Sequence, residues 1–259
     1  MPVPATGGTT DVGTGRPTPS ISGVKPMSQR VVLVTGGARG IGAAIATRMA
    51  ADGWRVVVAD QDVQGAPQPA RAVACDVSDE AAVNAVVSDV RQQEGRLDGL
   101  VCNAGVMIRK PIAELTMAEW SRVIGTNLTS TFLLVRAAEP MLRVSQGAVV
   151  TIASTRAHMS EPHTEAYAAS KGGLLALTHA LAISLGPDVR VNCISPGWIL
   201  TKGPAPTQEE HAFHPAGRVG VPTDIAALAA FLLGPESGFI TGGEFIVDGG
   251  VTRRMIYPE

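Results

Sequence analysis

The chain has 259 residues, a length that suits one large α/β domain or two small ones. Its formal net charge of -2 gives no electrostatic reason to expect binding to nucleic acid or to an acidic membrane. No apolar run is expected to approach the ~18 residues that a membrane span needs, so no membrane is expected.

Residues 1–28 are rich in Pro, Gly, Thr and Ser and lack the apolar core of a signal peptide. We expect a flexible tail there, followed by one domain over residues 29–259 that holds both the cofactor and the substrate. Cys75, Cys102 and Cys193 each lie in an apolar, strand-like run, and their odd number argues against a disulfide framework. Buried, reduced thiols in a cytoplasmic protein are the simplest interpretation.

From residue 30 onward, short apolar runs alternate with segments of helical spacing. The predicted strands cover residues 30–36, 54–60, 70–77, 97–105, 147–154, 189–197 and 243–250. The predicted helices cover residues 41–53, 79–95, 116–142, 165–186 and 222–234. Gly53 is expected to close the first helix and Ser78 to cap the second. The order predicts an α/β fold, a doubly wound and mostly parallel sheet with helices on both faces and ligands at the carboxyl ends of its strands.

The stretch "TGGARGIG", residues 35–42, follows the first strand and opens the first helix. Gly36, Gly40 and Gly42 offer the bare backbone N–H groups and the close approach that a phosphate needs at a helix N-terminus. Their spacing is G-x-x-x-G-x-G, not the common G-x-G-x-x-G, and a tight turn without a ligand is the alternative. The strand–turn–helix context favours a dinucleotide site.

The second predicted strand ends at Asp60, where a carboxylate can accept hydrogen bonds from the ribose hydroxyls of NAD. It would repel the 2′-phosphate of NADP. Arg39 favours NADP instead, because a cation in the glycine turn can pair with that phosphate. We give Asp60 more weight, so NAD is the favoured cofactor and NADP the alternative.

The stretch "YAASK" places Tyr167 and Lys171 one helical turn apart on one face. A free tyrosine titrates near ~10 and is a poor base at neutral pH, whereas a neighbouring ammonium favours the phenolate. Lowering its pKa by about three needs roughly 4 kcal/mol, which a close cation in a low-dielectric cleft can supply. Alone, the pair would more simply be two exposed residues of a helix.

Taken together, the motifs resemble those of the short-chain dehydrogenase/reductase family from about Val31 to Gly250. The motifs that carry the resemblance are "TGGARGIG", "CDV", "CNAG", "GTNL", "IASTRA", "YAASK" and "SPGWILT", with Ser154 thirteen positions before Tyr167. Two departures stand out. Residues 61–72 hold two prolines where family members usually carry a helix, so a loop or single turn is expected. The loop after Thr201 is short, which implies a small lid and an open site.

The resemblance implies a catalytic role for four residues. Tyr167 takes the hydroxyl proton of an alcohol or returns it to a ketone, and Lys171 lowers its pKa and holds the nicotinamide ribose. Ser154 hydrogen-bonds the substrate oxygen, and Asn127 holds a water that links Lys171 to solvent. It also implies the cofactor contacts Gly36, Arg39, Gly40, Ile41, Gly42, Asp60, Asp76, Val77, Asn103, Ala104, Gly105, Tyr167, Lys171, Pro196, Gly197, Ile199 and Thr201.

The substrate is an alcohol or ketone of small size, and its identity stays open among polyols, sugars, hydroxyacyl compounds and steroids. Candidate pocket residues are Thr155, Arg156, His163 and Trp198. Arg156 would either clamp a carboxylate or be a solvated loop residue. The histidines show no metal-ligand grouping, so no metal is expected.

Two other functions and an assembly remain in view. An NADPH-dependent 3-oxoacyl reductase is the first alternative. A non-catalytic cofactor-binding protein is the second, and it would be expected to lack members of the tetrad. The resemblance implies a homotetramer built through the two long helices around Asn127 and Tyr167 and through the last strand.

Overall fold

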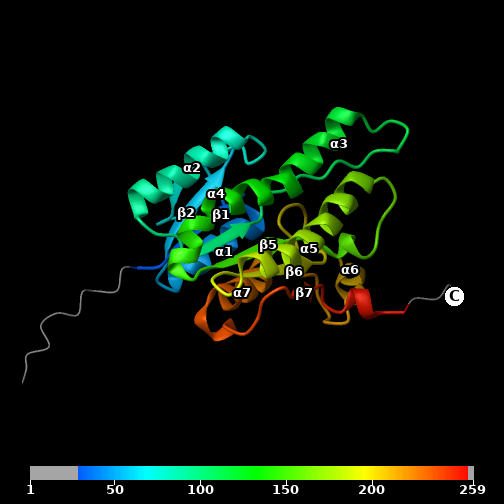
Figure 1. The fold of residues 1–259 in the computed structure, drawn as a ribbon. Coiled ribbons are helices and arrows are strands. Elements are labelled where there is room, and N and C mark those ends of the chain that lie inside the picture. The colour runs from blue at the N-terminus through cyan, green and yellow to red at the C-terminus, as the bar shows by residue number, and fades with distance from the viewer. Residues whose placement is uncertain (1–28, 256–259) are drawn as a thin grey trace, which may run out of the picture.

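The computed structural model describes residues 29–255, so the predicted tail and residues 256–259 lie outside the described part (Figure 1). Seven strands form one sheet in the order β3-β2-β1-β4-β5-β6-β7, and every pairing is parallel. The strands are β1 (Val31–Thr35), β2 (Arg55–Asp60), β3 (Arg71–Ala74), β4 (Gly99–Cys102), β5 (Ala148–Ile152), β6 (Arg190–Pro196) and β7 (Glu244–Val247). The predicted fold class is confirmed.

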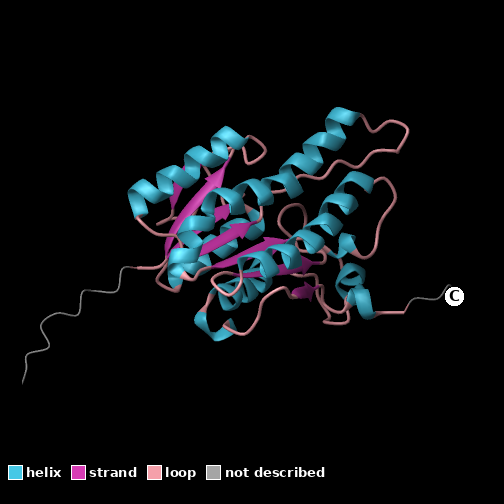
Figure 2. Ribbon diagram, in the orientation of Figure 1, coloured by secondary structure: helices cyan, strands magenta, loops and turns pink. Residues whose placement is uncertain are grey.

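Helices cover both faces of this sheet (Figure 2). They are α1 (Gly40–Ala51), α2 (Glu80–Glu94), α3 (Met117–Ile124), α4 (Ser130–Ser145), α5 (Glu165–Leu185), α6 (Gln208–Phe213) and α7 (Pro222–Leu233). One core cluster joins the sheet to α2 and α4, and a second joins its other face to α1 and α7.

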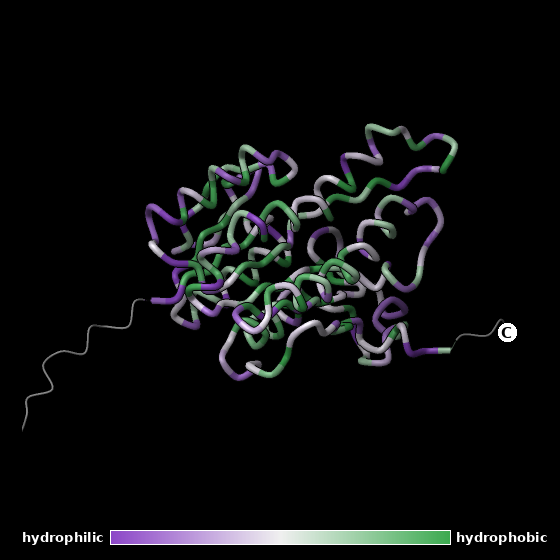
Figure 3. The backbone as a smooth tube through the Cα atoms, in the orientation of Figure 1, coloured by the Kyte–Doolittle hydropathy of each residue, from purple (hydrophilic) through white to green (hydrophobic). Residues whose placement is uncertain are grey.

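Strand β1 explains why the predicted strands are apolar without alternation. Val31 and Leu33 belong to the first core cluster, and Val32 and Val34 belong to the second. Successive side chains of a strand point to opposite faces, and both faces are buried here. Segments of hydrophobic residues therefore run through the middle of the molecule, and segments of hydrophilic residues lie outside them (Figure 3).

The predicted N-cap of the second helix was wrong by one residue. The cap is Asp79, whose side chain accepts a hydrogen bond from the Ala81 N–H. Ser78 instead donates its hydroxyl to Asp76 at 2.7 Å. An aspartate accepts the backbone N–H as well as a serine does, so the sequence offers two adjacent caps. Gly53 follows α1 with a φ of 81°, as expected for a closing glycine.

The predicted long helix over residues 116–142 is interrupted. A π-helical turn, η1 (Gly125–Thr129), separates α3 from α4 and adds one residue to that turn. Such a turn redirects the side chains next to it and is frequent at functional sites. Asn127 lies in it and is buried.

Two connections were singled out in the sequence, and the structure forms turns in one and a helix in the other. The segment before β3 forms turns and no helix, as the prolines predicted. The connection after Thr201 contains α6, which was not predicted, although Thr207 and Glu210 form the capping box that starts it.

Helix α5 bears on the expectation about membranes. With 21 residues and a mean hydropathy of 1.2, it is long and apolar enough to cross a membrane by length and composition alone, which that expectation overlooked. In the structure α5 lies against β6 and buries one stripe that includes Ser170, Lys171 and Leu174. It is a covering helix of the sheet in the described part of the chain.

The strand order reverses between β1 and β4, which are neighbours in the sheet. The loops that follow these two strands leave in different directions, and this opens a crevice where ligands bind in such folds. The "TGGARGIG" and "CNAG" motifs are those two loops.

Candidate active site

The glycine turn after β1 closes too tightly for side chains. A Cβ on Gly42 would lie 2.1 Å from the Gly36 carbonyl oxygen, and one on Gly36 would lie 2.9 Å from the Ala104 Cα. Gly36 and Gly40 also have φ values of 61° and 56°. No side chain caps the N-terminus of α1, whose N-cap is Arg39. The turn therefore presents a bare backbone cradle at a helix N-terminus, which fits the pyrophosphate of a dinucleotide.

The "CNAG" loop braces this turn. The Asn103 side-chain amide donates to the carbonyls of Thr35 and Gly36, both at 3.0 Å. The Thr35 hydroxyl accepts from the N–H groups of Asn103 and Ala104. Asn103 and Ala104 therefore act at least partly by holding the ends of β1 and β4 together.

Asp60, at the end of β2, is 7% exposed, and its carboxylate faces the glycine turn. It accepts hydrogen bonds from the N–H groups of Ala38 (3.1 Å) and Asp62 (3.3 Å). The Arg39 side chain is exposed.

Asp76 accepts two hydrogen bonds from Ser78, which together hold the pKa of its carboxyl below the usual range.

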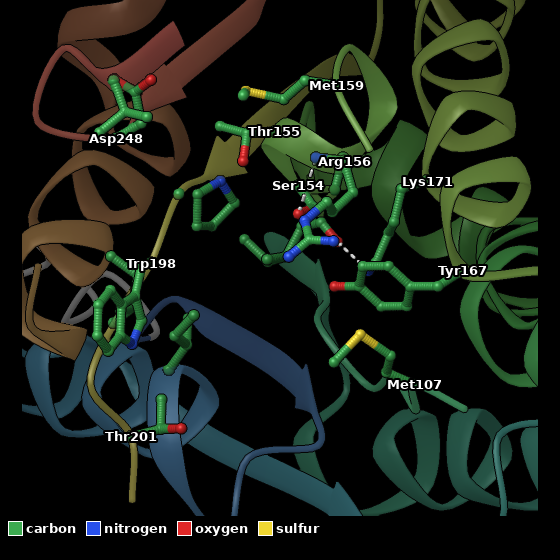
Figure 4. A pocket seen from close by; sticks show the side chains of 18 of the residues that line it. Met107, Ser154, Thr155, Arg156, Met159, Tyr167, Lys171, Trp198, Thr201 and Asp248 are labelled. Carbon is green, nitrogen blue, oxygen red and sulfur yellow. Dashed lines mark hydrogen bonds between the residues drawn. The ribbon is translucent and has the colours of Figure 1, made fainter. Parts of the chain in front are cut away.

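A cavity of about 990 Å³ opens at the carboxyl ends of β4, β5 and β6 (Figure 4). Ser154, Tyr167 and Lys171 line it. Ser154 follows β5, and Tyr167 and Lys171 come from the first turns of α5. The Ser154 hydroxyl is near enough to the Tyr167 phenol to lower the pKa of that phenol. Residues more than ten positions apart therefore meet on one wall, as the spacing of the motifs implied.

The pKa of Tyr167 differs from expectation. Burial raises it above its usual value, while the hydrogen bond with Ser154 and the charge of Arg156 act in the lowering direction without overcoming the burial. The sequence-based expectation that Lys171 lowers the pKa of Tyr167 is therefore not met. The reason lies in the position of the ammonium, which is 5.5 Å from the centre of the Tyr167 ring and is bonded elsewhere.

Lys171 is 4% exposed, and its ammonium donates to the Ile152 carbonyl at 2.8 Å. Burial lowers its pKa to about 8. At pH 7 the ammonium is still largely protonated, so a buried cation stands beside the phenol at the end of β5.

Asn127 lies behind the cavity wall. It is 1% exposed, accepts from the Val106 N–H at 2.8 Å, and donates to the Val106 carbonyl and to the Ser170 hydroxyl. Ser170 in turn donates to the Tyr167 carbonyl at 2.7 Å. These bonds tie the loop after β4 to the start of α5.

Many of the predicted cofactor and substrate residues line this cavity. From the cofactor set, the wall contains Ile41, Asn103, Gly105, Tyr167, Lys171, Pro196, Gly197, Ile199 and Thr201. From the substrate set it contains Thr155, Arg156 and Trp198. Gly36, Arg39, Gly40, Gly42, Asp60, Asp76, Val77 and Ala104 lie off that wall, toward the glycine turn and β2.

Two predicted side chains are placed away from the cavity. Val77 is buried in the core under α2, so it has only its backbone to offer. His163 is exposed and does not belong to the cavity wall. Its φ is 69°, and its carbonyl accepts a hydrogen bond from the Lys110 N–H at 3.0 Å. A substrate contact by His163 is therefore not supported.

Sequence reasoning missed several wall residues, among them Met107, Met159, Glu161, Phe213 and His214. Met107 follows the "CNAG" motif by two positions, and Glu161 lies five positions after Arg156, so nearness to motifs offered a signal for these. Phe213 and His214 come from α6 and its end, which no pattern placed over the site. Among residues 29–255, no three His, Cys, Asp or Glu side chains gather as a metal would require.

The chain is similar to known proteins in both sequence and fold. Residues 36–252 match the family model described as enoyl-(acyl carrier protein) reductase. An uncharacterized oxidoreductase of Thermotoga maritima is 47% identical, over 89% of this chain and 98% of its own length. The D-threitol dehydrogenase of Mycolicibacterium smegmatis is 38% identical, over 87% and 94%. A solved apo SCOR enzyme from Clostridium thermocellum is 40% identical with a TM-score of 0.84, covering 89% of this chain and 96% of that one.

Proposed function

This chain belongs to the short-chain dehydrogenase/reductase family of NAD(P)-dependent oxidoreductases that act on CH–OH groups, and we propose that it transfers a hydride between a secondary alcohol or ketone and NAD. The observation that carries the proposal is that Ser154, Tyr167 and Lys171 line one cavity, with the buried ammonium of Lys171 5.5 Å from the centre of the Tyr167 ring.

Tyr167 is the proton-transfer group of the proposed mechanism. In oxidation its phenolate takes the hydroxyl proton of the alcohol, and in reduction its phenol returns that proton to the ketone oxygen. Ser154 hydrogen-bonds the same substrate oxygen and thereby stabilises the charge that develops on it. Both side chains line one cavity, which suits contact of the two hydroxyl groups with the same substrate oxygen.

Lys171 and Asn127 support this proton transfer from behind. The Lys171 ammonium would hydrogen-bond the nicotinamide ribose once a cofactor is present. Asn127 fixes the loop after β4 against α5 through Val106 and Ser170. We propose that it also keeps the water that connects Lys171 to solvent.

The residues present fit a nicotinamide dinucleotide. The bare turn from Gly36 to Gly42 suits its pyrophosphate, and Ile41, Pro196, Gly197, Ile199 and Thr201 surround the half of the site that holds its ring. When bound, this cofactor accepts or gives the hydride.

The preference for NAD over NADP rests on Asp60. Its buried carboxylate stands at the end of β2 and faces the glycine turn, where a 2′-phosphate would meet a negative charge in a partly dry site. The exposed Arg39 beside it is the feature that favours NADP.

An NADPH-dependent 3-oxoacyl reductase is the second candidate. A relative of that name in Mycobacterium tuberculosis, the 3-oxoacyl-[acyl-carrier-protein] reductase MabA, is 36% identical over 87% of this chain and favours it. A non-catalytic cofactor-binding protein is disfavoured, because all four residues of the tetrad are in the chain and Ser154, Tyr167 and Lys171 share one cavity.

A screen of alcohols, sugars and hydroxy acids with NAD and NADP, in both directions, tests the function. We expect oxidation of secondary alcohols with a higher kcat/KM for NAD. Activity with NADPH and 3-oxoacyl thioesters alone would establish the second candidate. Normal cofactor binding without turnover of any substrate would leave the cofactor-binding protein.

We further propose that the enzyme acts in the cytoplasm as a homotetramer. The three cysteines are free and buried, which suits a reducing compartment. The sheet ends in the edge strand β7, and exposed apolar side chains lie on both long helices that the resemblance places at subunit contacts, among them Val144 on α4 and Ile183 on α5.

A further inference from the structure

We propose that the substrate of this site is a hydroxy acid, with a carboxylate one or two bonds from the carbon that is oxidised, and that Arg156 binds this carboxylate. The inference rests on the proposed function, since it names the class of alcohol that Tyr167 and Ser154 act on. It assigns to Arg156 a part in choosing the substrate.

The position of Arg156 follows from that of Ser154. Arg156 belongs to the short 3-10 helix η2 (Thr155–Ala157), and its backbone N–H donates to the Ser154 hydroxyl at 3.2 Å. The guanidinium extends into the cavity between Ser154 and the Tyr167 phenol (Figure 4). It is near enough to Tyr167 for its charge to act on the phenol. A group bound by Arg156 is therefore close to the carbon whose oxygen these two hydroxyls hold.

One end of the guanidinium is held and the other is not. Its Nη2 pairs with Glu161, which fixes the side chain, and only 20% of the side chain is exposed. Its Nη1 is buried and has no hydrogen-bond partner among the described residues. A buried N–H of a charged group without an acceptor is costly, so the free end of the fork calls for an acceptor from a ligand. A carboxylate matches the planar geometry of that fork.

The local charge favours an anion over a neutral acceptor. Glu161 is shared between Arg156 and Arg109, so two guanidinium groups face one carboxylate and the cluster keeps one positive charge. The hydrogen bond from Arg156 keeps the pKa of Glu161 below its usual value, so this carboxylate stays ionised at neutral pH. The other wall carboxylate, Asp248, is held by the N–H groups of Gly250 and Thr252 on the far side of the cavity.

The reaction balances without any further reactant. The hydroxy acid loses its carbinol hydrogen as a hydride to the oxidised cofactor and its hydroxyl proton to Tyr167, and the carbon becomes the carbonyl of an oxo acid. The carboxylate is unchanged, so Arg156 holds the same group in substrate and product.

The test compares matched pairs that differ only in charge: 2-hydroxybutanoate with its amide, and 3-hydroxybutanoate with its amide. For the wild-type protein with saturating NAD, we expect kcat/KM for at least one acid to exceed that of its amide. In Arg156→Gln the preference should fall by roughly 10- to 100-fold, the size expected for loss of a charged hydrogen bond, mainly through KM. Arg156→Lys should restore part of it. Arg48→Gln, which removes an exposed arginine paired with Asp52 outside the cavity, is the matched control.

A second readout needs no turnover. Calorimetric titration of the NAD-saturated protein with 2-oxobutanoate and with 3-oxobutanoate should show binding of the matching oxo acid to the wild type and to Arg48→Gln, and weaker binding to Arg156→Gln. Amides oxidised as well as both acids, or oxo-acid binding unchanged by Arg156→Gln, would overturn the inference and leave the proposed function standing. Failure to oxidise any alcohol in the wider screen, with cofactor bound, would instead remove the proposed function.

Discussion

Tyr167 is subject to two opposing influences. Its burial raises its pKa, because the phenolate loses hydration, while Ser154 and Arg156 act in the opposite direction. Burial prevails, and the pKa stays above its usual value. The phenolate that oxidation needs therefore depends on Ser154, Arg156 and any further group that favours negative charge on that oxygen.

Ser154→Ala tests this balance. Since the hydrogen bond from Ser154 lowers the pKa of Tyr167, its loss should move the midpoint of the rising limb of the oxidation profile, kcat/KM against pH, to higher pH. The rate at pH 7 should also fall by about 10²–10³-fold through loss of a hydrogen bond to the substrate oxygen. Steady-state rates between pH 6 and 10 measure both effects. A lower rate with an unchanged midpoint would show that Ser154 does not influence the tyrosine.

Burial of the charged Lys171 side chain destabilises the folded protein. Its pKa of about 8 in the folded protein lies below the 10.5 of a lysine in the unfolded chain, so the cost is fully present below pH 8 and disappears as pH approaches 10.5. The difference corresponds to about 3 kcal/mol. A substitution that removes the ammonium would leave the Ile152 carbonyl without this donor, which costs about 1–3 kcal/mol.

Lys171→Met should therefore abolish turnover and yet raise the free energy of unfolding at pH 7, by up to about 2 kcal/mol. That advantage should shrink between pH 8 and 10.5, since the wild type loses its penalty there. Urea unfolding of both proteins across this range measures it. An advantage that stays constant with pH would mean that burial of the charge is not its source.

At the scale of elements, the glycine turn is the part of the site that tolerates change least. Gly42→Ala would place a methyl group 2.1 Å from the Gly36 carbonyl oxygen, so the turn must open and the cradle for the pyrophosphate is lost. Affinity for NADH should fall by at least about 100-fold, as measured by fluorescence titration. Gly53→Ala is the control, because no atom lies within 4 Å of its Cβ; its strained φ should cost about 1 kcal/mol and leave NADH affinity unchanged. Equal affinities in both variants would contradict this account of the turn.

The elements also show where sequence reasoning succeeds and where it stops. The strands were predictable because both of their faces are buried, as at Val31 to Val34, which leaves an unbroken apolar run. The π turn at Asn127 was not, because helical spacing continues through it and the extra residue is decided by bonds to Val106 and Ser170, which are distant in sequence. Likewise, the pairing of Glu161 with Arg109 depends on a loop contact across 52 positions.

At the scale of the whole molecule, the glycine turn, the "CNAG" loop and Ser154 were readable because each follows a strand and the parallel sheet brings all strand ends to one edge. The cavity over them was not readable, since α6 and the segment after β7 close it from positions that no motif marks. The same limit holds for assembly, which depends on surfaces and not on motifs.

The proposed homotetramer predicts a mass of four times 26.7 kDa in light scattering after size exclusion. Ile183, 83% exposed on α5, should be buried at a contact between subunits. Ile183→Glu should therefore lower the mass, while Thr47→Glu on the exposed side of α1 should not. A wild-type mass near that of one chain at micromolar concentration would contradict the proposal.

The most direct test of the catalytic account is Tyr167→Phe, which removes only the hydroxyl group. With NAD bound as tightly as in the wild type, measured by calorimetry, the single-turnover rate of alcohol oxidation should fall by about 10²–10⁴-fold. A variant that binds NAD normally and oxidises the alcohol at the wild-type rate would contradict the account.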